Sequence, residues 1–112
     1  MKIYFSHSAS MSDIPAESPI EATLDTALAL FRSLDLRKGF LGIVLDEYST
    51  IQFLPQRGGI RIELLDTVRP AFDACVSEVG FVETLLHAAA QKHDVFAMAR
   101  EKCSHWEHTD LA

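Results

Sequence analysis

Three hydrophobic segments, separated by two short polar breaks, stand in the middle of the chain between residues 40 and 65. The first, 40–45, is apolar throughout, which predicts that both of its faces meet protein. In the other two, 50–54 and 60–64, apolar and polar residues alternate, so that one face of each segment is apolar. Alternation with a period of two, in segments rich in β-branched residues, is typical of β-strands. We therefore predict three strands here.

The two polar breaks indicate how these strands are joined. Residues 46–49 read Asp-Glu-Tyr-Ser, and residues 55–59 contain a proline and the pair Gly58-Gly59. Both breaks are rich in turn-forming residues and are short, so each joins antiparallel neighbours. The predicted centre of the fold is a three-stranded antiparallel meander.

The segment before the meander predicts a strand, a loop and a helix. Residues 2–6 are rich in β-formers and predict a short strand, and the polar stretch 8–18 predicts a loop. Ser18 and Pro19, with Glu21 three residues after the serine, predict a helix start with a capping box. The apolar stripe of this helix consists of Ile20, Leu24, Ala27, Leu28, Phe31 and Leu34.

The segment after the meander predicts further helices. Because of Arg69-Pro70, any helix in 66–74 begins at or after the proline. Residues 94–103 fit either a last strand or a helix capped by Asp94, and the helix-favouring run at their end favours the helix. From residue 104 we expect a frayed tail, except where Trp106 docks. Residues 77–92 predict a helix with Val79, Val82, Leu85, Leu86 and Ala89 facing inward.

Together these elements predict one α+β domain over residues 1–112. An antiparallel sheet that contains the meander, with the helices packed on one of its faces, is a two-layer sandwich that buries the apolar faces against one another. The hydrophobic fraction, 48% of 112 residues, is ample for one such core.

The charge balance bears on possible partners. Ten Lys and Arg residues stand against 16 Asp and Glu residues, which gives a formal net charge of −6. An acidic chain repels nucleic acid but suits a basic protein partner, whose approach it would steer. We find neither an N-terminal signal pattern nor a run long enough to span a membrane, and expect a cytoplasmic protein without membrane contacts. In a reducing compartment, Cys75 and Cys103 are expected to be free thiols.

The sequence contains no clear motif for catalysis, cofactor binding or metal binding. The five glycines match no phosphate-binding pattern, and no nucleophile motif stands out. Cys103, His105 and His108 cluster near the C-terminus, but a structural zinc site needs four ligands and this tail offers three. We therefore expect no cofactor, no metal and no enzymatic activity, and we interpret His87 and His93 as solvated helix side chains.

The candidate site is a surface. Asp46, Glu47 and Tyr48 occupy the tip of the first predicted hairpin and place two carboxylates beside an aromatic ring. Tyrosine is enriched at binding hot spots, and the neighbouring carboxylates can pair with Lys or Arg across an interface. Glu63 and Asp66, on and after the third predicted strand, complete the predicted partner-binding set. The plainer interpretation is a polar turn with a half-buried tyrosine.

The meander segments also carry a family resemblance. Residues 39–45 (GFLGIVL), 50–53 (TIQF) and 58–63 (GGIRIE) resemble the strand core of small bacterial immunity proteins, which neutralise toxins of polymorphic or contact-dependent growth inhibition systems. The resemblance implies a cytoplasmic protein without catalysis, which binds a secreted toxin domain and blocks its active site or an essential surface. Given the acidic balance of the chain, the expected toxin domain is basic.

Alternatives stay open at this point. One is a small enzyme whose scattered His and Glu residues converge only in three dimensions, and another is a structural subunit that dimerises through an edge strand of the meander. For the binding function itself, the acidic helix faces that carry Glu21 and Asp25, or Glu78 and Glu83, are alternatives to the hairpin.

Overall fold

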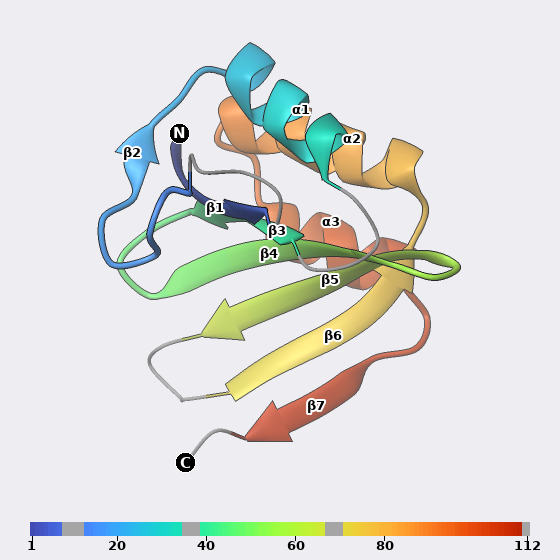
Figure 1. Ribbon diagram of the computed structural model, residues 1–112. Coiled ribbons are helices and arrows are strands. Elements are labelled where there is room, and N and C mark those ends of the chain that lie inside the picture. Colours follow the sequence, from blue (N-terminus) through green and yellow to red (C-terminus); the bar gives the residue numbers. More distant parts are fainter. Residues whose placement is uncertain (8–12, 35–38, 67–70, 111–112) are drawn as a thin grey trace.

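The computed structural model describes residues 1–7, 13–34, 39–66 and 71–110. Within these residues the chain forms a seven-stranded antiparallel sheet and three helices, and the helices cover one face of the sheet (Figure 1). The predicted two-layer α+β sandwich is confirmed. In chain order the elements are β1 (Lys2–His7), β2 (Ile20–Glu21), α1 (Leu24–Ser33), β3 (Gly39–Val44), β4 (Ser49–Gln56), β5 (Gly59–Asp66), β6 (Ala71–Ser77), α2 (Val79–Ala90), α3 (Val95–Lys102) and β7 (Glu107–Asp110).

The predicted meander forms the centre of the sheet. Strands β3, β4 and β5 pair in succession, with Ile43 opposite Ile51 and Phe53 opposite Ile62. The strand order is β2-β1-β3-β4-β5-β6-β7, and every neighbouring pair is antiparallel. The predicted first strand is therefore present as β1, inserted between β2 and the meander.

The meander has a fourth strand that the sequence analysis missed. β6 pairs with β5 along its whole length, with Cys75 opposite Ile62. Its sequence, AFDACVS, hides this role because its two alanines and Asp73 weaken both the β-propensity and the apolar alternation. The only feature that the sequence of this region predicts is a possible helix start at or after Pro70. The expectation for Arg69-Pro70 itself lies outside the described residues.

The core lies between the helices and the inner face of the sheet, meaning the face that the helices cover. On the outer face of β3, Gly42 is buried but Phe40 and Val44 are only half-buried. The prediction that both faces of this segment meet protein therefore holds at Gly42 alone. The inner-face side chains of the core are Ile3, Phe5, Leu41, Ile43, Ile51, Phe53, Ile60, Ile62, Leu64 and Cys75, and the helices add Leu28, Phe31, Val82, Leu85, Leu86, Ala88, Val95 and Ala99.

Helix α1 begins later than the capping-box pattern predicted. Its N-cap is Thr23, whose Oγ1 accepts a hydrogen bond from the Thr26 backbone N–H at 3.2 Å. Ser18 is not a cap, so the predicted helix start at Ser18 and Pro19 is wrong. Threonine is itself a good N-cap residue, so the local sequence allows a helix start at either Ser18 or Thr23. The structure of the residues before Thr23 decides between them.

The residues before Thr23 pair with the first strand. Ile20 lies opposite Ile3, and Glu21 lies opposite Lys2. This pairing draws Ile20 out of the predicted helical stripe and leaves it 46% exposed. The predicted loop over 8–18 lies partly outside the described residues; within the rest, Ile14 forms a single antiparallel bridge with Phe5.

The C-terminal helices follow the predictions closely. Helix α2 occupies the predicted segment, although Val79, at its first residue, is 50% exposed instead of facing inward. The ambiguous segment forms helix α3, with the Asp94 side chain accepting a hydrogen bond from the Ala97 N–H at 3.0 Å. No helix in the described part of the chain is both long and apolar enough to cross a membrane.

The expected frayed tail is partly wrong, because Glu107–Asp110 forms strand β7 on the free edge of β6. Trp106 docks as expected: its Nε1 donates a hydrogen bond to the Cys103 carbonyl at 3.0 Å, and the Arg100 guanidinium lies 5.6 Å from its ring centroid. All side chains of β7 are exposed. The strand was missed because polar, exposed residues give no hydrophobic alternation.

Replacing Ile62 with alanine is expected to lower the free energy of unfolding by about 2–5 kcal/mol, because the side chain is fully buried in the core. The matched control is Ile20→Ala in the exposed strand β2, where a loss of about 0.5 kcal/mol or less is expected. Urea unfolding measures both. Equal losses at the two positions would mean that the register assigned to β5 is wrong.

Candidate functional site

The tip of the β3–β4 hairpin, residues 46–48, is a turn with a defined shape. Asp46 Oδ1 accepts hydrogen bonds from the backbone N–H groups of Tyr48 and Ser49, both at 2.8 Å. This is an Asx turn, in which a carboxylate caps the residues that follow it. The Leu45 N–H donates to the Ser49 carbonyl at 2.9 Å and closes the turn. Asp46 therefore has a structural role in addition to its exposure.

Four of the five predicted partner-binding residues lie at this end of the sheet. Glu47 is exposed and Tyr48 is 53% exposed. Asp66 ends β5 directly opposite Ser49 in the register of β4 and β5. Glu63 is the exception, because it lies three residues earlier on β5 and on the other face of the sheet. The structure therefore brings Asp66 to the hairpin tip but separates Glu63 from it.

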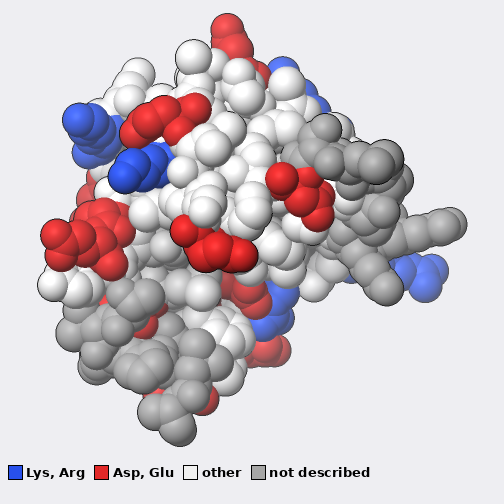
Figure 2. All heavy atoms as spheres, turned by 60° about the vertical axis from the view of Figure 1, so that its left-hand side comes forward, with Lys and Arg blue, Asp and Glu red and all other residues white. Residues whose placement is uncertain are grey.

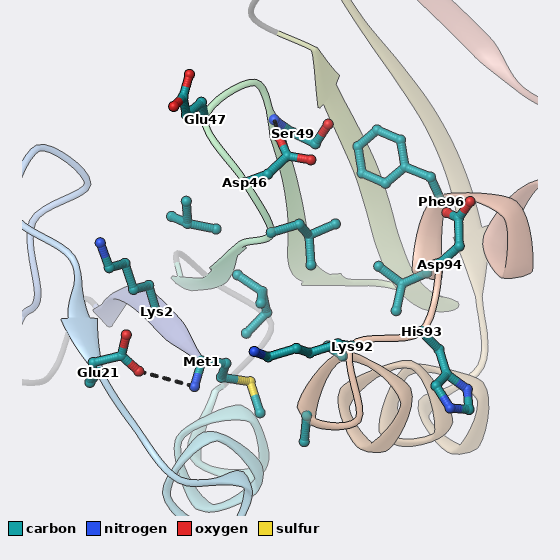
Figure 3. Close-up of a pocket in the computed structure, with 16 residues that line it drawn as sticks. Met1, Lys2, Glu21, Asp46, Glu47, Ser49, Lys92, His93, Asp94 and Phe96 are labelled. Carbon is teal, nitrogen blue, oxygen red and sulfur yellow. Dashed lines mark hydrogen bonds and ion pairs between the residues drawn. The ribbon is translucent and has the colours of Figure 1, made fainter.

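A cleft of about 1020 Å³ opens beside the hairpin tip. It lies between the ends of β1 and β3, the hairpin and the connection from α2 to α3 (Figure 3). Lys92 extends into it from that connection, where its backbone adopts a left-handed φ of 60°. The Met1 ammonium pairs with Glu21 at 3.2 Å on the opposite wall.

The charges of the cleft are mixed. Carboxylates of Glu21, Asp46, Glu47 and Asp94 line it together with the ammonium groups of Lys2 and Lys92. Figure 2 shows the side of the molecule that lies at the left in Figure 1: acidic side chains are spread among uncharged ones there, and Lys and Arg show at its upper left and along its edges. Sequence reasoning missed the cleft because only tertiary packing brings the α2–α3 connection to the hairpin. The arrangement suits a charged side chain presented by a partner.

A second polar feature crosses the open face of the sheet, meaning the face without helices. We call it the open-face row, and it consists of Tyr4, Gln52, Glu63, Arg61 and Glu107. Tyr4 Oη donates to Gln52 Oε1 at 2.8 Å, and Gln52 Nε2 donates to Glu63 Oε1 at 2.9 Å. Arg61 Nε donates to Glu63 Oε2 at 3.0 Å, and Arg61 also pairs with Glu107 at 3.5 Å. The row connects β1, β4, β5 and β7.

A glycine creates the space that the row needs. Gly42 lies opposite both Tyr4 and Gln52 in the sheet, and the Tyr4 ring covers it. Tyr4 is consequently only 6% exposed although it lies on the open face. Burial, and secondly the charge of Glu63, raises the pKa of Tyr4 to about 12. The phenol therefore remains a hydrogen-bond donor over the whole neutral range.

The sequence pattern found part of the open-face row. Alternation in 50–54 and 60–64 already places Gln52, Arg61 and Glu63 on the polar side of their strands, although only Glu63 was named as a candidate. Tyr4 and Glu107 were missed because each joins the row through pairing between distant segments. Nothing local to residue 4 or 107 signals that contact.

His108 and Cys103 of the C-terminal segment have different partners. His108, on β7, lies between Asp73 and Asp110. Its hydrogen bond to Asp73 is the main reason why its pKa is raised, and its hydrogen bond to Asp110 is the second. Cys103 instead contacts Cys75 on β6. Among the described residues, no group of three or more His, Cys, Asp and Glu side chains is placed to hold a metal ion.

The geometry thus provides two polar surfaces, the hairpin tip with its cleft and the open-face row. In the row, every side chain takes part in a hydrogen bond or an ion pair within the protein. At the tip, the Asp46 carboxylate is held by backbone N–H groups. Comparisons of the chain with protein-family models, curated proteins and solved structures gave no match.

Replacing Gly42 with alanine is expected to destabilise the protein by about 1–3 kcal/mol, because the added Cβ would lie 2.0 Å from Tyr4 Cζ. Gly80→Ala is the matched control: nothing lies within 4 Å of that position at the second residue of helix α2, so alanine should be tolerated and should stabilise by at most about 1 kcal/mol. Urea unfolding compares the two. If Gly42→Ala costs as much in a Tyr4→Ala background as in the wild type, the ring is not the obstacle.

Stability should also report the protonation of Tyr4. Its folded pKa, about 12, lies above the unfolded value of about 10, so in this range the unfolded chain loses the proton that the folded protein keeps. The stability that comes from keeping this proton is fully present below about pH 10. As the pH rises from about 10 to about 12, the free energy of unfolding falls by up to about 3 kcal/mol. The difference in unfolding free energy between wild type and Tyr4→Phe isolates it. A difference that does not change with pH would contradict the assignment.

Proposed function

We propose that this protein acts by binding a basic protein partner at the end of the sheet formed by the hairpin tip and its cleft. The observation that carries the proposal is the Asx turn at Asp46, which presents Glu47 and the half-exposed ring of Tyr48 on a preformed loop. A preformed binding loop loses less conformational freedom when it binds than a mobile one does. Carboxylates around an aromatic anchor suit Lys and Arg side chains of a partner.

The charge of the whole chain supports the same partner chemistry. The net charge of −6 attracts a basic protein over a longer range than any single contact. Close to the surface, Asp66 at the end of β5 adds a further carboxylate near the tip. The cleft beside the tip gives a long side chain a place to enter, between its carboxylates and the ammonium groups of Lys2 and Lys92. Long-range attraction and local contacts therefore favour the same kind of partner.

We further propose that the partner is a bacterial toxin domain and that the protein is its cytoplasmic immunity protein. The support is the resemblance of residues 39–45, 50–53 and 58–63 to the strand core of such proteins. These segments contain all of β3 and parts of β4 and β5, so they are the scaffold of the hairpin and not its contact surface. In this proposal the scaffold is the shared part, and the tip is what distinguishes one toxin from another.

The identity of the partner is tested with the protein encoded by the gene immediately upstream. Co-expression of this chain is expected to restore the growth of cells that produce the toxin domain of that protein, and the two purified proteins should form a stable complex. If the upstream product is harmless, or if the two proteins do not bind, the toxin part of the proposal is wrong.

The contact surface is tested by the kinetics of that complex. Asp46→Asn with Glu47→Gln removes both charges while the asparagine oxygen can still cap the turn, so association should slow about three- to tenfold at low salt and little at high salt. Tyr48→Ala should instead speed dissociation about thirtyfold, equivalent to about 2 kcal/mol, if the ring is the anchor. Stopped-flow measurements at two salt concentrations separate the two effects.

The matched control is Glu78→Gln with Glu101→Gln, which removes two exposed charges at the start of α2 and the end of α3. This control lowers the net negative charge by the same amount as the hairpin variant, so it should slow association less than that variant does and should leave dissociation unchanged. If it slows association while the hairpin variant does not, the helix faces carry the contact and the hairpin tip is only a turn.

A further inference from the structure

The two cysteines meet although they are distant in sequence. Cys75 lies on β6 and Cys103 caps the C-terminus of α3, and both are unbonded. Their sulfur atoms are nevertheless 2.6 Å apart, which compares with about 2.0 Å in a disulfide bond. Packing of α3 on the sheet has therefore already brought the two sulfurs together, so joining them needs little movement of the chain.

The pair is accessible from one side. Both residues line a cavity of about 710 Å³, together with Lys102, His105 and Trp106. Cys103 is half-buried, whereas Cys75 is 5% exposed. Burial, and secondly the hydrogen bond with Cys103, raises the pKa of the Cys75 thiol. Cys103 is therefore the sulfur that a small reagent in the cavity meets first.

The pair also lies where the last strand begins. The Cys103 N–H donates to the Ala99 carbonyl at 3.0 Å, and the Cys103 carbonyl accepts the hydrogen bond from Trp106, the residue before β7. Glu107, the first residue of β7, pairs with Ala74, the neighbour of Cys75 on β6. A bond between the two sulfurs would thus join β6 covalently to the short connection that leads into β7.

We infer that Cys75 and Cys103 are a redox-active pair, and that a low-molecular-weight disulfide converts them to an internal disulfide that fixes strand β7 to the sheet. The inference is independent of the proposed toxin partner. In a reducing compartment the pair remains as two thiols, and oxidation forms the bond.

The chemistry is thiol–disulfide exchange with oxidised glutathione as the oxidant. The Cys103 thiolate attacks one glutathione sulfur, the S–S bond of glutathione breaks, and the first glutathione thiolate leaves. The Cys75 thiolate then attacks the Cys103 sulfur of the mixed disulfide and expels the second glutathione thiolate. The two protons lost by the cysteines end on the two glutathione thiolates. One protein disulfide and two glutathione thiols result, so the protein is oxidised and glutathione is reduced.

The fixation of β7 follows from its weak attachment. All its side chains are exposed, and among the described residues they pair with the rest of the sheet through Glu107 with Arg61 and His108 with Asp73, each pair having one well-exposed member. Exposed pairs of this kind contribute little to stability. A covalent bond between β6 and the connection that leads into β7 therefore adds a permanent link to the backbone pairing and the two side-chain pairs that now hold this strand.

The test incubates the folded protein with oxidised and reduced glutathione at graded ratios, followed by acid quenching and intact-mass measurement. The wild type should lose two thiols and keep no glutathione. Cys75→Ala should retain one glutathione on Cys103, because no second thiol can expel it, and Cys103→Ser should react much more slowly. Wild-type protein that keeps both thiols, keeps bound glutathione or forms linked dimers would overturn the inference.

The effect on β7 is read separately, by hydrogen exchange and thermal unfolding of the oxidised and reduced wild type. Closing a loop of this length should raise the melting temperature by about 10–20 °C, and the amides shared by β6 and β7 should exchange at least tenfold more slowly. Cys103→Ser is the control and should show neither change when the redox poise is varied. A disulfide that forms without slower exchange in β7 would leave the redox pair but refute the fixation of the strand.

Discussion

The burial of one face of the sheet under three helices is the interaction on which the rest of the structure depends. Side chains alternate along a strand, so burying Ile62 and Leu64 determines the register of β5 against its neighbours. The same register turns Arg61 and Glu63 outward. A shift by one residue would bury a carboxylate and expose the isoleucine, at a cost comparable with the whole stability of a domain of this size. The polar surfaces are therefore consequences of the core.

The two polar surfaces differ in what they leave for a partner. In the open-face row, Tyr4, Gln52, Glu63 and Arg61 satisfy one another across the sheet, so a partner that displaced these contacts would have to replace each of them. At the hairpin tip the internal hydrogen bonds instead stabilise the loop itself, and the exposed ring of Tyr48 stays on the surface. The row thus connects strands of the sheet, whereas the hydrogen bonds of Asp46 hold the shape of the turn.

The sequence predicted the parts of this fold that depend on local pattern. The meander, β1, α2 and α3 follow from period and capping, and so does the outward direction of Glu63. The errors lie where partners distant in sequence decide: Ile20 joins a strand because β1 is beside it, and β6 and β7 form because β5 offers an edge. The candidate site shows the same division. The hairpin tip could be named from its residues, but the cleft and the Cys75–Cys103 contact exist only once the helices have packed.

The two outermost strands also determine how the sheet meets other copies of itself. One margin ends in β2, a two-residue strand, and the other in β7, which carries Glu107, His108 and Asp110 on four exposed positions. Short, charged margins are poor templates for another chain to extend the sheet. The long strands of the meander, which would be good templates, lie inside and have both sides paired. Strand β7 therefore covers four of the seven residues on the outer edge of β6, Ala71–Ala74, and closes that part of the edge to pairing with another copy of the chain.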